Sequence, residues 1–286
     1  MRTAFRMLFL GAALIGCATQ PSMKSVPTRP ILIQGALQME IGTLLKRLDG
    51  VQVETIGPWT FWHGTISGYP VIVSKTGMGT ANAAGATAVA IQHYSPVAII
   101  NQGTSGGHDP GLRVYDVVIG TEAVSLGAFR TPYRAKGSGS NPVEWIPLDL
   151  RGSPGSVDGD LHENQIGRSR SDDGLLAAAR AVKHLYERGR VVDGVIGSSD
   201  VWNEEIDRIT AFRATHNTSV EEMETAPSAQ VAALFKVPFL GIRVVSANVT
   251  SGGGYDAATA EACQDFVLRV VSAYVSSVIP SRTPAA

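Results

Sequence analysis

The feature that most constrains the fold is the stretch of residues 97–120, VAIINQGTSGGHDPGLRVYDVVIG, where two apolar runs flank a glycine-rich segment. Its first four residues form a short apolar run, which is typical of a buried parallel strand. The next part, residues 103–107, contains only glycine, threonine and serine and predicts a loop. Such a loop lets a ligand approach the backbone and offers N–H and hydroxyl groups to an anion, a water or a sugar. A tight turn that needs glycine only for its backbone angles fits the same letters.

A strand followed by a helix is predicted at the start of the folded region. Residues 31–34 are apolar, and after them Ile41, Leu44, Leu45 and Leu48 recur at helical spacing. Glu40 therefore lies at a helix N-terminus on the rim formed by strand ends, where open α/β folds bind their ligands. A favourable charge at the positive end of the helix dipole is the alternative explanation for Glu40.

A second glycine turn is predicted further along the chain. Residues 60–63 and 71–75 resemble a hairpin, and the turn over residues 76–84 opens a helix. We expect the inner stripe of that helix to contain Ala81, Ala84, Ala88 and Ile91. The turn at residues 77–79 either faces a ligand or allows close packing of helix on sheet.

Residues 128–173 form the least regular region, with blocks such as RTPYRAKGSGSNP and RGSPGSVDGD. An irregular connection of this length is usually a functional flap, an interface element or an insertion, and the sequence does not choose among these. A helix is expected over residues 175–186.

An aromatic residue follows the next predicted strand, residues 194–197. Trp202 lies just past that strand and before a polar helix, so it offers a stacking face for a purine, with core packing as the alternative. A carboxylate cluster, EEME at residues 221–224, then precedes a helix over residues 225–235. Three acids in four residues cannot all be buried without neutralisation. At least one must face solvent or a partner, and a solvated helix start is the simplest alternative for Glu221 and Glu222.

Arg243 interrupts the last apolar strand, PFLGIRVVS. An unpaired buried guanidinium is costly, so we expect a carboxylate or a ligand-bound water beside it. A final helix over residues 258–278 has a stripe of apolar residues that we expect to be buried: Cys263, Phe266, Val267, Val270, Val271 and Tyr274. Cys263 is best explained as a small buried hydrophobe.

Composition and net charge limit the classes of molecule that the chain is expected to bind. A length of 286 residues allows one large or two smaller domains, and the 44% hydrophobic and 17% charged composition is that of a globular chain. The formal net charge of −1 gives no electrostatic reason to bind nucleic acid. A small neutral substrate agrees better with this net charge than nucleic acid does.

The N-terminus resembles a bacterial lipoprotein signal. Arg2 and Arg6 precede an apolar run over residues 7–15, and the sequence LIGC ends at Cys17. The resemblance implies a signal peptide over residues 1–16, lipidation of Cys17 and a tether over residues 17–30. It also implies anchoring on the periplasmic side, with Ala18 favouring the outer membrane. An ordinary secretory signal or an anchor helix is the alternative, although the apolar run is short for a membrane span.

Six motifs in order resemble the purine nucleoside phosphorylase and nucleosidase superfamily: GALQME, KTGMGTANAA, NQGTSGGHDPGLRVYDVVIG, GVIGSSDVW, VEEMETA and VPFLGIRVVS. The methylthioadenosine/S-adenosylhomocysteine nucleosidase branch is the most similar. The resemblance implies a single domain over residues 31–280 with an α/β fold, a three-layer sandwich whose central mixed, twisted sheet is flanked by helices. It further implies cleavage of the N-glycosidic bond of a purine nucleoside without a metal or cofactor, by a homodimer or higher homo-oligomer.

The same resemblance assigns roles to individual residues. It implies that Glu40 activates the attacking water and that Thr104 and Arg243 help to hold this water. Ser105 and Gly106 belong to the substrate-binding floor. The ribose is bound by Met223 and Glu224, whose carboxylate takes the 2′- and 3′-hydroxyls, and Trp202 stacks on the base.

One departure concerns the leaving group. Where adenosine-type nucleosidases have Ser-Asp, and the aspartate donates a proton toward N7, this chain has Ser246 and Ala247, followed by Asn248. We expect Asn248 to donate a hydrogen bond to N7 and to shape recognition around O6. An asparagine in this region resembles the 6-oxopurine-specific phosphorylases, and this resemblance favours inosine- or guanosine-like substrates over methylthioadenosine-like ones. Asp256 is a candidate substitute acid.

The reaction class has alternatives. A carboxylate at position 40 would repel phosphate, which favours hydrolysis over phosphate-dependent cleavage. A phosphorylase remains the alternative enzyme. A non-catalytic nucleoside-binding lipoprotein is the alternative outside enzymes, because the general-acid aspartate is missing.

Overall fold

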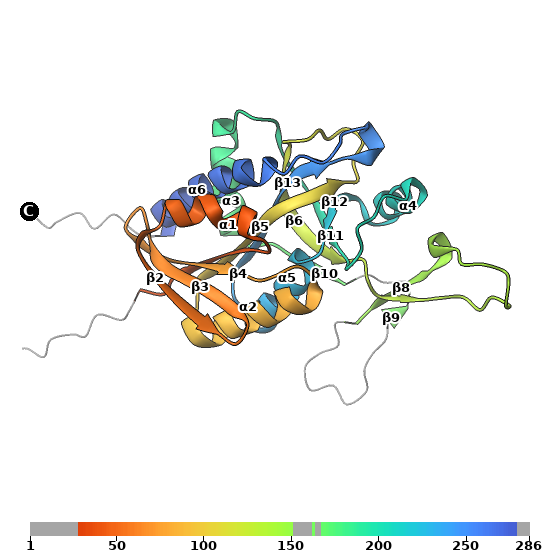
Figure 1. The fold of residues 1–286 in the computed structure, drawn as a ribbon, viewed down its shortest axis with the longest axis horizontal. Helices are drawn as coiled ribbons and strands as arrows, with labels where there is room; N and C mark the ends of the chain where they lie inside the picture. Colours follow the sequence, from red (N-terminus) through yellow and green to blue (C-terminus); the bar gives the residue numbers. More distant parts are fainter. Residues whose placement is uncertain (1–27, 151–161, 164–166, 279–286) are drawn as a thin grey trace, which may run out of the picture.

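A large mixed sheet forms the centre of the protein, and the computed structural model describes residues 28–150, 162–163 and 167–278 (Figure 1). The predicted signal peptide and most of the tether, residues 1–27, lie outside the described residues, as do residues 279–286. The strands are β1 (Ile31–Gly35), β2 (Asp49–Ile56), β3 (Trp59–Ile66), β4 (Tyr69–Lys75), β5 (Ala98–Gly107), β6 (Val117–Ser125), β7 (Phe129–Arg130), β8 (Ile146–Asp149), β9 (His162–Glu163), β10 (Arg168–Arg170), β11 (Val191–Ser198), β12 (Thr218–Glu222) and β13 (Phe239–Ala247).

The order of the strands in the sheet is β10-β6-β11-β12-β5-β1-β4-β3-β2, and β13 pairs with both β5 and β6. Parallel pairs such as β1 with β5 and β5 with β13 occur beside antiparallel pairs such as β12 with β5. Because β6 also pairs with β11, and β11 with β12, the five strands β5, β13, β6, β11 and β12 form a closed circuit. The predicted hairpin is confirmed as β3 and β4, which pair antiparallel.

Helices cover both faces of the sheet (Figure 1). One layer contains α1 (Gln38–Lys46), α3 (Asp173–Val182) and α6 (Thr259–Val278), and the other contains α2 (Thr80–Tyr94) and α5 (Thr225–Leu234). Each layer closes its own apolar core against the sheet. The α/β fold with a central mixed sheet flanked by helices is therefore confirmed. The stripe predicted for α6, including Cys263, is also confirmed, because all six of its residues are buried.

The glycine-rich segment is strand and not loop, which corrects the sequence prediction. Residues 103–107 continue β5 to its end at Gly107, and the turn follows over residues 108–116. The glycines are required by close approach: a Cβ at Gly103 would lie 2.6 Å from the Glu40 carboxylate oxygen Oε1. A Cβ at Gly107 would overlap the side chain of Asn248.

The inner stripe of α2 differs from the predicted one. The buried residues are Ala83, Ala86, Thr87, Ala90 and Ile91, whereas Ala81 is exposed. The alanine-rich sequence offers small apolar residues on every face, so its periodicity does not identify the buried one.

The irregular region projects from the body of the protein (Figure 1). There β7, β8 and β9 form a separate three-stranded sheet, while β10 joins the main sheet beside β6. The projecting part is tied to α4 (Ile206–His216) by Arg208, whose guanidinium lies over the rings of Phe129 and Trp145. Residues 151–161 and 164–166 lie outside the described part.

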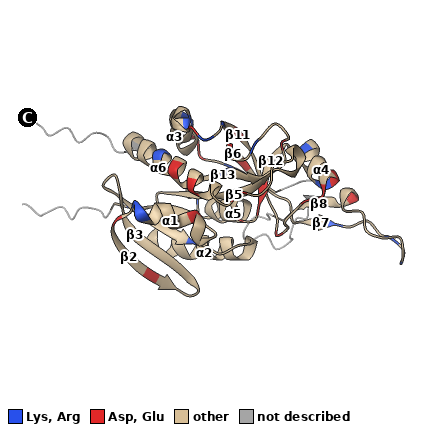
Figure 2. Ribbon diagram, turned by 45° about the horizontal axis from the view of Figure 1, so that its top comes forward, with Lys and Arg blue, Asp and Glu red and all other residues tan. Residues whose placement is uncertain are grey.

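Basic and acidic residues are spread over the structure. Figure 2 shows Lys and Arg on separate elements, such as α3, α4 and α6. No helix in the described part of the chain combines the length and apolar character needed to cross a membrane.

Candidate active site

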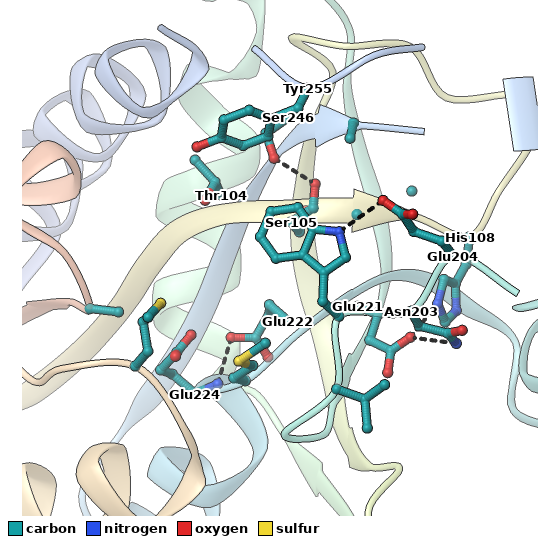
Figure 3. A pocket seen from close by; sticks show the side chains of 18 of the residues that line it. Thr104, Ser105, His108, Asn203, Glu204, Glu221, Glu222, Glu224, Ser246 and Tyr255 are labelled. Carbon is teal, nitrogen blue, oxygen red and sulfur yellow. Dashed lines mark hydrogen bonds and ion pairs between the residues drawn. The ribbon is translucent and has the colours of Figure 1, made fainter. Parts of the chain in front are cut away.

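A pocket opens where the carboxyl ends of β5, β12 and β13 meet the start of α1 (Figure 3). The loops that follow β11 and β13 complete its wall. The carboxyl ends of strands are the usual ligand-binding edge of α/β sheets. Of the predicted site residues, the structure brings seven to this pocket: Glu40, Thr104, Ser105, Gly106, Trp202, Met223 and Glu224.

Glu40 is held in one orientation by four donors. It lies in the first turn of α1 and is 5% exposed. Its Oε2 accepts hydrogen bonds from the backbone N–H groups of Ala36 at 2.9 Å and Leu37 at 3.1 Å. Its Oε1 accepts from the Thr104 N–H at 2.8 Å and the Thr104 hydroxyl at 2.9 Å. The carboxylate is stabilised by the helix N-terminus and also faces the pocket, so both explanations given for Glu40 describe real contacts.

The remaining floor is made by backbone and short side chains of β5 and β13. The Ser105 hydroxyl donates to the Val244 carbonyl at 3.0 Å, and the Ser246 hydroxyl donates to the Ser105 carbonyl at 3.1 Å. These bonds tie the two strands together. Gly106 leaves the floor open, because a Cβ there would have only one neighbour within 4 Å, at 3.9 Å.

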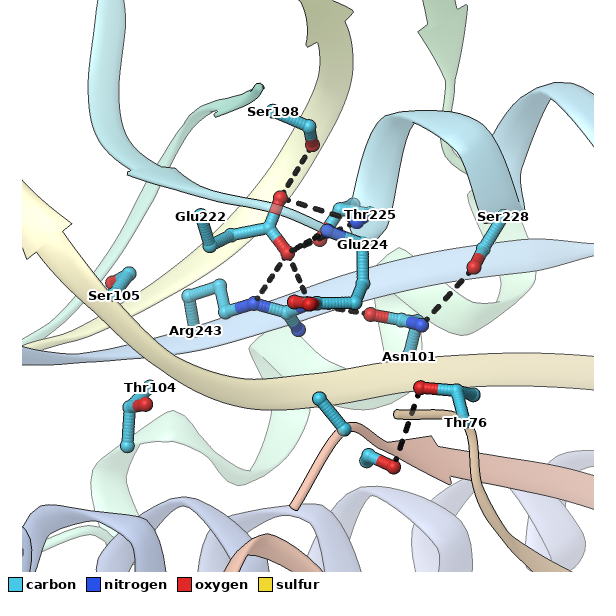
Figure 4. A network of polar contacts seen from close by, with 12 residues as sticks. Thr76, Asn101, Thr104, Ser105, Ser198, Glu222, Glu224, Thr225, Ser228 and Arg243 are labelled. Atoms are coloured by element: carbon cyan, nitrogen blue, oxygen red, sulfur yellow. Dashed lines mark hydrogen bonds and ion pairs between the residues drawn. The ribbon is translucent and has the colours of Figure 1, made fainter. Parts of the chain in front are cut away.

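Arg243 lies behind the pocket, and its predicted carboxylate partner is confirmed (Figure 4). The guanidinium is 1% exposed and donates to Glu222 Oε2 through Nε at 3.1 Å and Nη2 at 2.5 Å. Nη2 also donates to Asn101 Oδ1, and Nη1 donates to the Ile242 carbonyl at 3.0 Å. Arg243 does not line the pocket, so it acts on the site through its carboxylate partners.

Glu222 is the ionised partner of this pair. Burial raises the pKa of its carboxyl, but Arg243, Ser198 and the Glu224 N–H outweigh burial and hold the pKa below its usual value. The side chain also accepts from the Thr225 N–H at 3.0 Å. Both Glu221 and Glu222 are buried in β12, so the alternative of a solvated helix start is wrong for them.

Glu224 is buried beside this pair but behaves differently. Its Oε1 accepts from the Gly79 N–H at 2.9 Å, and its Oε2 is 3.9 Å from Arg243 Nη2. Burial and the negative charge of Glu222 raise the pKa of Glu224 to about 8, although Arg243 opposes the shift. The turn at residues 77–79 therefore contacts a site carboxylate, and Met78 and Met223 line the pocket beside it.

Trp202 is not a core residue. It is 66% exposed and lines the pocket, and its Nε1 donates to Glu204 Oε1 at 3.2 Å. Its ring meets that of Tyr255 edge to face, with centroids 5.9 Å apart. These two rings give the pocket an aromatic wall suited to a flat ligand.

Asn248 and Asp256 do not line the pocket, which corrects the expected contacts with the base. The Asn248 amide donates to the carbonyls of Asp109 at 2.9 Å and Leu112 at 3.0 Å, and its oxygen accepts from Thr250. The Asn248 residue is 1% exposed, and its amide group makes its hydrogen bonds within the protein and not to a ligand. Asp256 accepts from the Tyr115 hydroxyl at 3.0 Å and caps the start of the next segment.

His108 and Glu221 line the pocket although the sequence predicts no ligand-binding role for either of them. His108 Nε2 lies 2.8 Å from Glu221 Oε2, and both side chains are buried. They meet because β12 pairs antiparallel with the end of β5, so that Glu221 lies opposite Gly106. The available signals are the histidine directly after the glycine segment and the carboxylate cluster at residues 221–224. The strand pairing that brings the two together is invisible in the sequence.

Acidic side chains dominate the pocket. Within the described residues, its ionisable lining consists of His108, Tyr255 and five glutamates, Glu40, Glu204, Glu221, Glu222 and Glu224, without lysine or arginine. The same part of the chain contains no group of three or more His, Cys, Asp or Glu side chains arranged to hold a metal ion.

The sequence of residues 30–279 matches the family model described as the Phosphorylase superfamily. The chain belongs to this superfamily. Among its curated members, the 5′-methylthioadenosine/S-adenosylhomocysteine nucleosidase of Bacillus thuringiensis (strain Al Hakam) is 32% identical over 221 residues, covering 76% of this chain and 84% of the relative. The Bacillus anthracis nucleosidase of that name has the same identity and coverage.

Solved structures of the superfamily agree with the fold. The nucleosidase from Neisseria meningitidis in complex with methylthio-immucillin-A is 25% identical with a TM-score of 0.66, covering 87% of this chain and 100% of that one. Futalosine hydrolase of Helicobacter pylori strain 26695, at 18% identity and a TM-score of 0.68, shares the fold over 86% of this chain and 98% of its own.

Proposed function

We propose that this protein hydrolyses the N-glycosidic bond of purine nucleosides and releases the free base and the sugar. The observation that carries the proposal is the Glu40 carboxylate, fixed by four hydrogen-bond donors on the rim of an acidic pocket. The curated nucleosidase relatives support the same reaction class.

The proposed reaction uses Glu40 as a general base. Glu40 takes a proton from water, whose oxygen bonds to C1′ of the sugar while the bond from C1′ to the purine nitrogen breaks. The bonding electrons stay on the base, which leaves as a purine anion and takes a proton from solvent. Positive charge develops on the sugar ring in this process. The pocket carboxylates stabilise that charge electrostatically, and Thr104 holds Glu40 in position through its hydroxyl and N–H.

Substrate binding is assigned to the two ends of the pocket. Glu224 and Met223 line the end that binds the ribose, where the carboxylate of Glu224 accepts from sugar hydroxyls. Trp202 provides the stacking face for the base, and Ser105 and Gly106 form the floor between the two ends. Arg243 has a positioning role, because it holds Glu222 and lies 3.9 Å from Glu224.

The charge of the pocket favours water over phosphate as the acceptor. A phosphorylase must bind an anion, and the described lining contains five glutamates and no lysine or arginine. Bringing phosphate next to Glu40 would cost Coulomb energy in a poorly solvated site.

The test is an assay of the purified protein with inosine, guanosine, adenosine and methylthioadenosine, each with and without phosphate. Release of free base without phosphate is expected. Turnover that requires phosphate would assign the protein as a phosphorylase, and tight binding without turnover would assign it as a nucleoside receptor.

We also propose a lipid anchor at Cys17 on the periplasmic side of the envelope, at the outer membrane. The support is the arrangement of residues 1–17 in the sequence: two arginines, an apolar run and the sequence LIGC. Labelled palmitate should enter the wild-type protein and not the Cys17→Ala variant. Purine nucleosides reaching the periplasm would then be its substrates.

A homodimer or higher homo-oligomer is proposed as the assembly, on the resemblance to relatives. The projecting β7–β8 segment is a candidate contact, since Tyr133 in its connecting loop is 93% exposed. Light scattering of the wild-type protein and a Tyr133→Ser variant tests this. A monomeric wild-type protein would contradict the proposal.

A further inference from the structure

We infer that Glu221, positioned by His108, selects a 6-oxopurine base by accepting its N1–H. This inference rests on the proposed hydrolysis of purine nucleosides and names the base that the pocket prefers. It gives a role to two residues that have none in the sequence motifs containing them, His108 and Glu221, and it moves base recognition from Asn248 to β12.

Glu221 lies at the end of the pocket away from the proposed ribose site. Figure 3 shows Glu221, Asn203 and His108 gathered on one side and Glu224 on the other. Asn203 directly follows Trp202, the proposed stacking residue, and its Nδ2 donates to Glu221 Oε2 at 3.2 Å. A base stacked on Trp202 therefore extends its six-membered ring toward Asn203 and Glu221.

Every described contact of the Glu221 carboxylate is with a donor. Oε2 accepts from His108 Nε2 at 2.8 Å and from Asn203 Nδ2, while Oε1 accepts from the Ser199 hydroxyl at 2.5 Å. Each carboxylate oxygen has room for about two hydrogen bonds. Oε2 is therefore filled, and Oε1 has room for one more donor. Glu221 is 6% exposed and lines the pocket, so a ligand bound there can supply that donor.

His108 cannot contact the ligand through its ring nitrogens. Nδ1 lies 2.8 Å from the Thr218 hydroxyl and Nε2 donates to Glu221, so both nitrogens are used inside the protein. The ring is 2% exposed and stacks near Phe212, with centroids 6.2 Å apart. His108 is therefore a positioning residue that fixes the direction of the Glu221 carboxylate.

Asn203 supplies a donor beside this acceptor. Its Oδ1 accepts from the Glu205 N–H at 3.2 Å, and this bond together with the contact to Glu221 fixes which end of the amide faces which way. The second hydrogen on Nδ2 has no acceptor among the described residues. The pocket thus presents a donor next to an acceptor, which complements the neighbouring O6 and N1–H of a 6-oxopurine. Adenine offers the same pair in the opposite order, with an acceptor at N1 and a donor at the 6-amino group, so the charge of the acceptor decides between the two bases.

The charge on Glu221 is what separates 6-oxopurines from 6-aminopurines. The lactam N1–H of hypoxanthine or guanine is a more acidic donor than the amino group of adenine, and it makes the stronger charge-assisted hydrogen bond to a carboxylate. Adenine has a bare acceptor at N1, which the carboxylate repels. A site built to bond a substrate N–H discriminates strongly against a substrate without it, because its buried polar groups are then left unpaired.

The first test compares substrates on the wild-type protein. We expect kcat/KM for inosine and guanosine to exceed that for adenosine by about 10-fold or more. Inosine methylated at N1 lacks the hydrogen and should lose about 10-fold against inosine, and this comparison needs no variant to fold. Methylthioadenosine is included as the substrate named for the curated relatives.

The second test uses Glu221→Gln, His108→Phe and, as a matched control on the surface, Glu187→Gln. Glu221→Gln should reduce the ratio of inosine to adenosine kcat/KM by about 10-fold or more, because an amide loses the charge and also offers a donor to N1 of adenine. His108→Phe should reduce the same ratio less, and the control should leave it unchanged. A ratio is measured because a general loss of structure lowers both rates together.

Three results would overturn the inference: a wild-type preference for adenosine or methylthioadenosine, equal rates on inosine and its N1-methyl derivative, or an unchanged ratio in Glu221→Gln. In each of these, continued release of base from some nucleoside leaves the proposed hydrolysis intact. If no nucleoside releases its base, the proposed function fails and takes the inference with it.

Discussion

The two ends of the pocket are built in different ways. At the ribose end, backbone N–H groups hold the carboxylates: Ala36, Leu37 and Thr104 bind Glu40, and Gly79 binds Glu224. At the proposed base end, three side chains hold Glu221: His108 after β5, and Ser199 and Asn203 in the loop after β11. Backbone donors are set by the fold itself, whereas side-chain donors change with a single substitution. The proposed ribose end is thus fixed by the backbone of this fold, and the proposed base end depends on individual side chains.

The largest effect is expected at the ribose end, from Glu40→Gln. Loss of the general base should lower kcat by about 10⁴-fold, since the amide cannot accept a proton from water. Calorimetric binding of a nucleoside should fall much less than kcat, because Glu40 is proposed to act on the water; the amide oxygen keeps one of the two donor pairs, and its NH2 group faces the other. Equal losses of nucleoside binding and turnover would instead show that Glu40 is a structural residue. The proposed catalytic role of the ribose end of the pocket would then be wrong.

The second effect tests the buried pair behind the ribose end. Arg243→Met should lower the free energy of unfolding by about 3–5 kcal/mol, because it leaves Glu222 buried without its counter-ion. Denaturant unfolding measures this. The double variant Arg243→Met with Glu222→Gln should recover part of the loss, while failure to recover any would contradict the pairing as the source of the stability.

The third effect concerns the pH dependence of the ribose end. With its pKa raised to about 8, Glu224 is protonated in the folded protein below that pH and ionised above it. We expect KM for the nucleoside to fall by about 10-fold from pH 6 to pH 9, since only the ionised carboxylate accepts from two hydroxyls. Glu224→Gln should remove this pH dependence, and an unchanged profile would exclude Glu224 as its source.

The same titration affects stability. The folded pKa lies above the unfolded value of 4.5, so the folded state holds more protons between pH 4.5 and about 8. The contribution of Glu224 to stability therefore falls as the pH rises through that range. Thermal unfolding of Glu224→Gln should depend less on pH than that of the wild-type protein.

The smallest effect on specificity is expected from Asn248→Ser. The variant leaves the carbonyls of Asp109 and Leu112 without their donor and should cost about 1–3 kcal/mol of stability. The ranking of nucleosides by kcat/KM should stay within about 2-fold of the wild-type ranking, because the side chain lies outside the pocket. A clear change of ranking would return base recognition to this segment.

The sequence predicts the ribose end better than the base end for a physical reason. Glu40 follows a strand and opens a helix, so its position depends on local structure that the sequence shows. Arg243 lies in an apolar strand, so the sequence predicts that it has a carboxylate partner. The sequence does not identify this partner, which the structure shows to be Glu222.

The contacts at the base end come from residues that are distant in the chain. Residues 108 and 221 meet only through the antiparallel pairing of β12 with β5, and Ser199 reaches the same carboxylate from the end of β11. The glycine segment was predicted as a loop because glycine is common in turns. It is a strand because it pairs with β13 and β12. Its glycines are needed because the side chains of Glu40 and Asn248 occupy the space where a Cβ would project.

The backbone floor of β5 has a consequence for how new specificities arise in this protein. A methyl group added at Gly103 would displace the Glu40 carboxylate, and one added at Gly107 would strike Asn248, so the floor tolerates almost no substitution at these positions. Variation that alters substrate choice without loss of catalysis must come from the walls, on β12 and in the loop after β11. Libraries for retargeting the enzyme should therefore randomise residues 199, 203 and 221 and leave the glycines of β5 untouched.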